Sequence, residues 1–583
     1  MTEHDPQRTE IRDGMQIDWQ VPVPMDDGTV LRCDIYRPTG GGRYPVVLSY
    51  GPYAKGLAFQ EGYPLQWELM VTERPDAAAG SSNKYQSWEV VDPEKWVPHG
   101  YACMRVDSRG TGWSPGYVDV WSPREARDLY ECIEWAARQR WSSGKVGLNG
   151  ISYYAINQWQ VAALQPPHLA AMIPWEGAAD FYRDVTHHGG ILSEFCGNWY
   201  ARQVMSVQYG LGDQAPKNPN TGEPVAGPMR LSEAELRANR QDLGAEILDQ
   251  ETDTAWYRER SADFTKIEVP FLSAANWGGQ GLHPRGNFEA YVQAASPQKW
   301  LEVHGLNHWT HFYTDYGVEL QRSFFDRFLK GEADRWPDSP RVRLNIRRPG
   351  EDFTERGEQE WPLARTRWTR FYLDANDCRL AEQAPSTEAS VAYDGLGDGV
   401  TFDLGRIEED MEITGPISAK LFAASTTVDA DLFLVLRVFD PQEQEVTFAG
   451  ALDPNTPVAQ GWLRASHRRL DPARSLPHRP WHSHDEKQPL QPGAVYELDI
   501  EIWPTCIVVP AGYRIALTVR GKDYEYRGEV SQFARNFYYA NRGVGPFTHA
   551  DPADRPKEIF GGSVSLHTGG ACPSYLLLPI IPA

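Results

Sequence analysis

A serine and a histidine in the first half of the chain have the local sequence that nucleophilic catalysis needs. Ser152 stands in the run Gly-Ile-Ser-Tyr-Tyr-Ala, which follows a short apolar segment and precedes the helical pattern of residues 157–164. A serine at such a strand-to-helix turn projects its hydroxyl above a sheet, and the Tyr153 amide at the helix start can hold a developing oxyanion. A serine that only caps the helix is the alternative, and this pattern leaves both open. Tyr154 departs from the strict Gly-x-Ser-x-Gly form.

A serine hydroxyl is a weak nucleophile unless a base removes its proton. His308 ends the run His-Gly-Leu-Asn-His that follows the predicted strand 300–303, and it is our candidate base. His304 and His311 stand at spacings that could also indicate a metal site. Because no cysteine or carboxylate set accompanies the three histidines along the chain, we predict neither a metal nor a cofactor.

The segments that must position these residues have the pattern of a parallel sheet covered by helices. Between about 30 and 335, brief apolar runs end in Gly, Pro or Asn and alternate with helical patterns. Ser122 to Glu125 form a capping box for a helix that is predicted to run to about Arg140. Residues 178–262 are polar and interrupt this rhythm, so we interpret them as a helical cap inserted over the site.

After about 340 the texture changes to alternating apolar and polar runs with turn signals between them, and helical patterns become scarce. This pattern predicts an all-β sandwich or jelly roll. The expected architecture is therefore an α/β domain of residues 15–177 and 263–335, a helical cap of residues 178–262, and a C-terminal β-sandwich of residues 340–583.

Composition excludes several classes of protein. The 583 residues carry 57 Lys and Arg against 79 Asp and Glu, which gives a net charge of −22. This acidic balance argues against nucleic acid and anionic membrane as partners, because both need a basic surface. The seven cysteines are widely spaced and form no C-x-x-C pattern, so no disulfide framework is predicted. The polar start of the chain and the lack of a long apolar stretch lead us to expect a cytoplasmic protein.

On these motifs the chain resembles the CocE/NonD family of serine hydrolases, which includes cocaine esterase, the X-Pro dipeptidyl-peptidases and the α-amino acid ester hydrolases. The matching segments, in order, are residues 51–55, 107–116, 150–153, 300–308 and 461–467. The resemblance implies an α/β-hydrolase domain with a helical cap and a C-terminal jelly roll, with Ser152 as nucleophile and His308 as base and then acid. It also implies that the Tyr53 hydroxyl joins the Tyr153 amide in the oxyanion hole. Family members are often dimers or larger, so a homo-oligomer stays open.

The sequence departs from that family at the triad acid. The family pattern has an aspartate after the seventh strand in a Gly-Trp-Tyr-Asp type motif, and Gly279 occupies that position here. A glycine can neither orient an imidazole nor stabilise its cation. Glu176 follows the preceding strand directly, and our hypothesis is that it orients His308; the alternative is that it faces the cap or solvent. The remaining candidates, weaker on position, are Asp180, Asp315 and Glu302.

We therefore predict a serine hydrolase that cleaves an ester or amide bond of a small-molecule substrate through an acyl-enzyme on Ser152. Three alternatives stay open: an acyltransferase or cyclase using the same acyl-enzyme, an X-Pro-type aminopeptidase, and a non-catalytic binding protein whose triad is broken at Gly279. Trp175 and Trp277 are candidates for the wall of an apolar acyl pocket, and packing in the core is the alternative for both.

Overall fold

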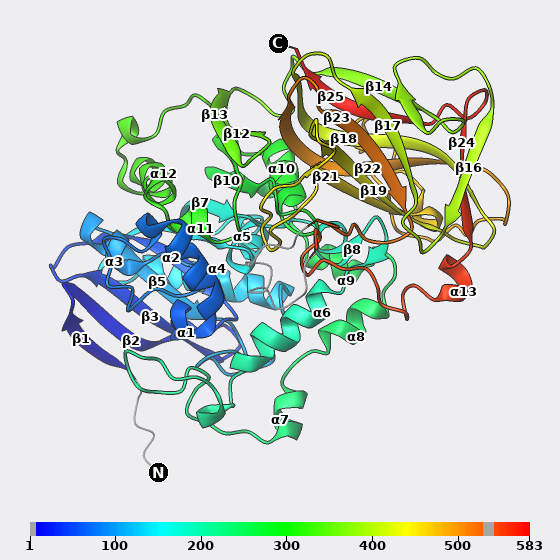
Figure 1. Ribbon diagram of the computed structural model, residues 1–583. Coiled ribbons are helices and arrows are strands. Elements are labelled where there is room, and N and C mark those ends of the chain that lie inside the picture. The colour runs from blue at the N-terminus through cyan, green and yellow to red at the C-terminus, as the bar shows by residue number, and fades with distance from the viewer. Residues whose placement is uncertain (1–6, 529–541, 583) are drawn as a thin grey trace.

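Two large sheets organise the protein. The computed structural model describes residues 7–528 and 542–582. One sheet contains eleven strands and the other contains twelve. Figure 1 shows the first sheet and its helices from the lower left to the upper centre, the second sheet at the upper right, and α6 to α9 below the second sheet. This is the mixed α/β domain followed by a β domain that the sequence predicts.

The first sheet has the strand order β1-β2-β3-β5-β4-β6-β7-β10-β11-β12-β13, and its strands from β5 to β12 in that order are parallel. The central strands β5 and β10 are buried along their whole length, as expected for a sheet with both faces covered. The strands are β1 (Arg8–Arg12), β2 (Met15–Pro24), β3 (Val30–Pro38), β4 (Tyr44–Gly51), β5 (Ala102–Asp107), β6 (Ser142–Ile151), β7 (Leu169–Trp175), β10 (Phe271–Asn276), β11 (Lys299–His304), β12 (Val342–Arg348) and β13 (Asp352–Glu358).

Helices between these strands cover the sheet. The predicted start of α4 is correct, because the Ser122 side chain accepts a hydrogen bond from the Glu125 N–H at 3.3 Å. The capping box is only half formed, since the Glu125 carboxylate accepts from the Trp121 N–H at 2.8 Å and from the Tyr153 hydroxyl. The helices of this domain are α1 (Phe59–Gly62), α2 (Pro64–Glu73), α3 (Pro93–Trp96), α4 (Pro123–Ala137), α5 (Tyr153–Ala162), α10 (Pro284–Gln293), α11 (Thr310–Tyr313) and α12 (Asp315–Phe325).

The insertion between β7 and β10 forms a cap of short elements. Its two ends meet where the Ala262 N–H donates to the Ala179 carbonyl at 3.2 Å. The cap also reaches the β domain, because the Arg464 N–H donates to the Gly189 carbonyl at 2.9 Å. The elements of the cap are β8 (His187–His188), β9 (Ile191–Leu192), α6 (Phe195–Trp199), α7 (Glu233–Ala238), α8 (Leu243–Leu248) and α9 (Ala255–Glu259).

The second sheet is built from long alternating strands around an aliphatic core of its own. Its largest strand pairing joins β18 and β22 in antiparallel register. The strands are β14 (Arg367–Asp374), β15 (Arg379–Ala381), β16 (Ala389–Asp394), β17 (Val400–Arg406), β18 (Met411–Ser425), β19 (Asp431–Phe439), β20 (Glu445–Val446), β21 (Ala459–Arg464), β22 (Tyr496–Val509), β23 (Arg514–Arg520), β24 (Ser563–Thr568) and β25 (Tyr575–Ile581); one helix, α13 (Lys557–Phe560), lies before β24.

β12 and β13 fall within the range predicted for the β domain, yet they extend the first sheet. β12 pairs in parallel with β11, and β13 pairs antiparallel with β12. The outer strand β13 is largely exposed and polar, so its sequence lacks the continuous apolar run that marks the inner strands of the first sheet. The buried Arg347 of β12 donates to the Cys506 carbonyl of β22 at 2.9 Å, which joins the two domains.

Two further sequence expectations concern the whole chain. All seven cysteines are free, in line with the absence of a disulfide framework. Among the described residues, no helix has the length and apolar character needed to cross a membrane.

Candidate active site

Ser152 lies at a sharp turn between β6 and α5, with φ 58° and ψ −112°. A non-glycine residue at positive φ is strained, and such strain clusters at functional sites. The Ser152 N–H donates to the Trp175 carbonyl at 3.1 Å, which ties the turn to the end of β7. Tyr153 is the first residue of α5, so its N–H has no acceptor within the helix.

Two glycines make room for Tyr154, the residue that breaks the strict Gly-x-Ser-x-Gly form. A Cβ at Gly51 would lie 2.5 Å from Tyr154 Cε1, and a Cβ at Gly150 would lie 2.4 Å from Tyr154 Cβ. Gly150 also has φ 151°, at the edge of the region that favours glycine. The strict motif has a glycine at position 154. Here Gly51 and Gly150 provide the space that the larger Tyr154 side chain needs.

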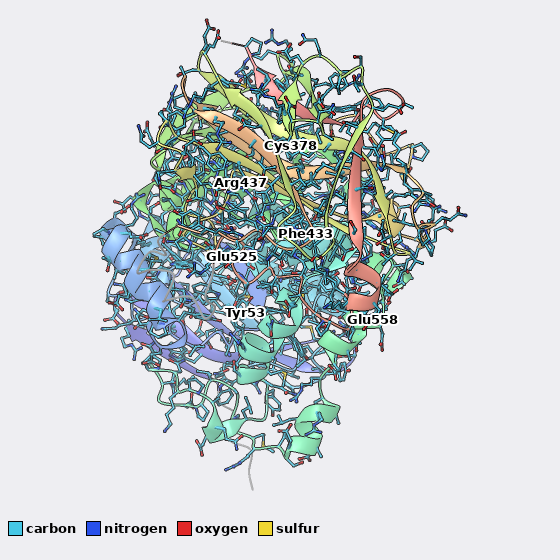
Figure 2. All side chains as sticks on the ribbon, turned by 45° about the vertical axis from the view of Figure 1, so that its right-hand side comes forward. Tyr53, Cys378, Phe433, Arg437, Glu525 and Glu558 are labelled. Carbon is cyan, nitrogen blue, oxygen red and sulfur yellow. The ribbon has the colours of Figure 1, made fainter. Side chains whose placement is uncertain are left out.

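Tyr53 follows β4 and is buried beside the turn that carries Ser152, with its ring centroid 6.1 Å from that of Tyr153. Its hydroxyl accepts a hydrogen bond from Trp199 Nε1 at 3.0 Å, which leaves the phenolic proton to donate elsewhere. Burial raises the pKa of Tyr53 well above its ordinary value, so the phenol keeps that proton. In Figure 2 Tyr53 lies near the middle of the molecule, below the second sheet.

A buried ion pair fixes the segment that carries Tyr53. Lys55 Nζ lies 2.6 Å from Asp107 Oδ2, and the Lys55 N–H donates to Asp107 Oδ1 at 2.6 Å. Both side chains are almost fully buried. Because Asp107 ends β5, the pair connects the Tyr53 segment to the neighbouring strand.

Glu176 contacts His308 directly. His308 Nδ1 lies 2.8 Å from Glu176 Oε2, and both side chains are buried. Glu176 follows β7 at φ 48°, and its N–H donates to the Ala274 carbonyl of β10 at 2.7 Å. The carboxylate therefore leaves the sheet at the position that the sequence hypothesis requires, facing the imidazole instead of solvent.

The other oxygen of Glu176 contacts a second histidine. His304 Nε2 lies 3.1 Å from Glu176 Oε1, and His304 Nδ1 lies 2.7 Å from Glu302 Oε2. Asn276 Nδ2 also donates to Glu176 Oε1, at 3.2 Å. Along the chain no carboxylate set marks these histidines as metal ligands; in the fold Glu176, which is 128 residues from His304, meets it where the parallel strands end.

Glu89, a residue that the sequence analysis did not single out, contacts the second nitrogen of His308. His308 Nε2 lies 3.0 Å from Glu89 Oε1, and the Glu89 side chain is buried. The Glu89 carbonyl accepts from the Ile151 N–H at 3.0 Å, so this residue also borders the turn that carries Ser152. Within residues 7–528 and 542–582 the Ser152 hydroxyl makes no hydrogen bond. In the sequence, the feature that could have indicated a buried role for Glu89 is its place as a single acid between Trp88 and the apolar pair Val90-Val91.

The protonation of this group follows from its charges. The carboxylates of Glu176 and Glu89 raise the pKa of His308 to about 10, against the opposing effect of burial. The two histidines lower the pKa of Glu176 to about 2. Burial raises the pKa of Glu89. A cationic imidazole held between two carboxylates is the charge state that this geometry stabilises.

Gly279 lies in the turn after β10, where the β domain packs closely. A Cβ on its neighbour Gly278 would lie 2.5 Å from the Gly450 Cα. Ala451 bonds to both sides of the site: its N–H donates to the Gly278 carbonyl at 2.9 Å, and its carbonyl accepts from the His308 N–H at 3.0 Å. The β domain thus holds the segment that carries His308.

The remaining candidate acids have other partners. Asp180 pairs with Arg183 at 2.9 Å, and the Asp315 N–H donates to Asp76. Glu302 contacts His304 and not His308. None of the three occupies the position that Glu176 has.

Both tryptophans proposed for an acyl pocket are fully buried in core contacts. The Trp175 indole packs against His304 with ring centroids 5.0 Å apart, and the Trp277 indole packs against Phe288 at 5.5 Å. The core alternative therefore describes Trp175 and Trp277. Aromatic rings nearer to Tyr53 come from Trp199 of the cap and from Tyr153.

Glu302, His304 and His311 bring ligand-type atoms within 4.8 Å of one another among the described residues. Carboxylates already engage both nitrogens of His304, at 2.7 and 3.1 Å. We therefore interpret the three residues as part of a hydrogen-bond network and not as a metal site.

Two family models match the chain. Residues 27–313 match the X-Pro dipeptidyl-peptidase (S15 family) model, and residues 334–577 match the model of the X-Pro dipeptidyl-peptidase C-terminal non-catalytic domain. Together they cover the cap and most of both sheets, while β1 and β2 precede the first match.

Individual proteins of several kinds are similar over most of their length. The crystal structure of a CocE/NonD family hydrolase from Staphylococcus aureus is 31% identical, with a TM-score of 0.83 over 100% of this chain and 98% of that one. Cocaine esterase from a Rhodococcus species is 25% identical over 96% of this chain and 98% of its own. A Xaa-Pro dipeptidyl-peptidase from Streptococcus gordonii is 22% identical over 85% of this chain and 72% of its own.

Proposed function

Because the chain belongs to the CocE/NonD family of serine hydrolases, we propose that it cleaves its ester or amide substrate through an acyl-enzyme on Ser152. The observation that carries the proposal is the contact of 2.8 Å between Glu176 and His308 Nδ1. It supplies a triad acid where the family position holds only Gly279.

In the first step His308 Nε2 takes the Ser152 hydroxyl proton while Oγ bonds to the carbonyl carbon. Glu176 holds the Nδ1 proton, which fixes the tautomer and stabilises the imidazolium that forms. The carbonyl oxygen becomes an oxyanion that accepts hydrogen bonds from the Tyr53 hydroxyl and the Tyr153 amide.

In the second step the tetrahedral intermediate collapses, and His308 gives its proton to the leaving alcohol or amine. A water molecule then attacks the acyl carbon and passes a proton to His308 Nε2. The bond to Ser152 Oγ breaks, the serine recovers its proton, and the carboxylic acid leaves. Atoms and protons balance without another reactant.

Glu89 must release His308 before this sequence can begin. In the structure Nε2 bonds to Glu89 Oε1 at 3.0 Å, and this is the nitrogen that has to face Ser152. Catalytic hydrogen bonds often tighten only when a substrate is bound. We infer that the imidazolium leaves its Nε2 proton on Glu89, whose pKa is raised by burial, and that the neutral imidazole then exchanges Glu89 for the serine and the leaving group during turnover.

The surroundings of Tyr53 favour an apolar acyl group. Trp199 and Trp121 stack with centroids 5.0 Å apart, and Tyr63 and Trp88 stack at 4.2 Å. Aromatic walls of this kind bind apolar groups and exclude water from the reacting bond. An acyltransferase would use the same walls, and it differs only in the second nucleophile.

A panel of p-nitrophenyl esters and X-Pro p-nitroanilides would test the proposal, with wild type compared with Ser152→Ala. Hydrolysis by the wild type that is lost in the variant is expected, with esters of apolar acids preferred. Turnover that persists in Ser152→Ala would overturn the role of the serine. Product formed with an added alcohol or amine acceptor, at the expense of free acid, would favour the acyltransferase.

A further inference from the structure

The hydrogen-bond chain at the active site continues behind Glu176. We propose that the Glu302–His304 pair is a positioning unit for this acid: it holds one oxygen of Glu176 so that the other stays on His308 Nδ1. The inference rests on the proposed roles of Ser152 and His308. It adds two residues, neither of which touches the reacting atoms.

The contacts run in one line from β11 to the base. Glu302 Oε2 lies 2.7 Å from His304 Nδ1, His304 Nε2 lies 3.1 Å from Glu176 Oε1, and Glu176 Oε2 lies 2.8 Å from His308 Nδ1. Each of the four side chains is at most 4% exposed. Water therefore has little access to compete for any of these bonds.

Glu176 needs this support because its backbone conformation is strained and its side chain is buried. It leaves the sheet at the end of β7 at φ 48°, and its carboxylate is fully buried. A buried carboxylate with one oxygen unpaired is costly, and a carboxylate held at one oxygen can turn. Asn276 Nδ2 and His304 Nε2 both bind the second oxygen, at 3.2 and 3.1 Å, and of the two only His304 can bring a positive charge. The His304 ring is itself fixed, by Glu302 on one side and by stacking on Trp175 at 5.0 Å.

The pair also places a positive charge behind the acid. Glu302 and Glu176 raise the pKa of His304 to about 9, and the neighbouring histidines lower the pKa of Glu302 to about 2. The charges along the line then alternate: Glu302 negative, His304 positive, Glu176 negative. A cation on the far side of Glu176 opposes protonation of His308, which favours the neutral imidazole that a base requires.

Other titratable groups face this line from the elements packed against it. His283, at the start of α10, stacks on His308 with centroids 4.9 Å apart, and His311 of α11 stacks on His304 at 4.6 Å. Among the described residues, the titratable groups that act on the line are Glu89, His283, His311 and Tyr316, and Arg74 acts on His311. The experiment must therefore change His304 or Glu302 alone.

His304→Gln removes the charge while its amide can still donate to Glu176. Without the cation, the charge of Glu176 acts on His308 alone, so the imidazole keeps its proton to a higher pH. We expect the acidic limb of the reaction with a fluorophosphonate probe to move up by about one pH unit. At neutral pH the labelling rate should fall about 10- to 100-fold, as for other residues that orient a site residue.

Glu302→Gln should move the acidic limb of the labelling rate in the same direction by a smaller amount. The variant removes one of the two anions that keep His304 charged, and Glu176 remains. Since Glu302 and His304 act as a unit, the double variant should behave like His304→Gln alone. His168→Gln is the matched control: this histidine pairs with Glu134 at 2.8 Å, and its side chain is 42% exposed. Its pH profile should match that of the wild type.

The possible outcomes separate this inference from the function on which it rests. Wild type that is not labelled, or Ser152→Ala that still is, would overturn the proposed function. Labelling at Ser152 with profiles of His304→Gln and Glu302→Gln that coincide with His168→Gln would overturn the positioning unit alone, as would additive effects in the double variant. If His304→Gln does not fold by circular dichroism, Glu302→Gln decides.

Discussion

Two groups of buried histidines in this molecule have pKa values that are shifted in opposite directions. In the active site, His304 and His308 lie between carboxylates, which raise their pKa values to about 9 and about 10. At the junction of the cap and the β domain, His187, His467 and His482 are buried just as deeply, and their pKa values are lowered to about 3. Burial opposes the charged imidazole in both places, and the partner decides which form persists.

The partners at the junction are other cations and neutral groups. Arg464 lies near His187 and His467, and Arg183 lies near His482, so positive charge adds to the effect of burial. His467 Nδ1 faces His484 Nδ1 at 3.0 Å, an arrangement that needs one ring to accept. The surroundings of His304 and His308 therefore stabilise the charged imidazole, while those of the junction histidines stabilise the neutral form.

The largest difference between the groups should appear when the same substitution is made in each. His308→Gln removes the base, and loss of a triad histidine lowers turnover by roughly 10⁴- to 10⁶-fold. His467→Gln should leave turnover within a few-fold, because this ring lies at the junction and makes no contact with the triad. Rates of ester hydrolysis would measure both, and equal losses in the two variants would contradict the distinction.

Acid should weaken the junction before it affects the site. Between about pH 6.5 and about 3 the unfolded chain binds protons that folded His187, His467 and His482 do not, so stability falls as the pH falls through this window. Each histidine contributes at most about 1.4 kcal/mol per pH unit.

The two charged histidines of the site contribute a constant stability over that range. The raised pKa values of His304 and His308 stabilise the fold fully below about 6.5, and this contribution is lost only as the pH rises through about 9 and 10. The lowered pKa of Glu176 adds stability above about 4.5 that is lost toward about 2. Melting temperatures from pH 7 to 4 should therefore fall more steeply for the wild type than for His467→Gln; parallel curves would refute this assignment.

Glu89 offers a way to make the active-site histidine more like those of the junction. Glu89→Gln removes one carboxylate from His308, so the pKa of the imidazole should fall, by about one to three units for a charge at this distance. The base is then neutral at lower pH, and the acidic limb of kcat/KM should extend downward. A pH profile identical to that of the wild type would show that Glu89 does not control His308 during turnover.

The smallest effect is expected at Gly279. A Cβ there would lie 3.1 Å from Pro284 Cδ, a contact that a slight shift can relieve. Gly279→Ala should retain turnover within about twofold and change stability by less than about 1 kcal/mol. A loss comparable to that of His308→Gln would mean that the turn itself, and not Glu176, supports the base.

The parts of the site that could be predicted lie at strand ends. Ser152, Glu176 and His308 each follow an apolar run, and the carboxyl ends of parallel strands meet at one edge of a sheet. Topology alone therefore brings their side chains together, and the predicted neighbourhood of Glu176 and His308 agrees with their contact of 2.8 Å. Their catalytic roles remain predictions.

The parts that could not be predicted depend on long-range packing. Glu89 stands in an irregular loop that precedes α3, 219 residues from His308, and no periodicity marks it. Glu302 and His304 share one face of β11, as strand alternation predicts, but the contact of His304 with Glu176, 128 residues away, has no signal in the sequence. The burial of Trp175 and Trp277 likewise follows from neighbours that are distant in sequence.

The most direct test of the central claim is the rate at which a fluorophosphonate labels wild type, Ser152→Ala and Glu176→Gln, each confirmed as folded by circular dichroism. The account predicts rapid labelling of the wild type, none of Ser152→Ala, and labelling of Glu176→Gln that is slower by about 10⁴-fold, as for loss of a triad acid. Labelling of Glu176→Gln at the wild-type rate would contradict the claim that this glutamate replaces the aspartate missing at Gly279.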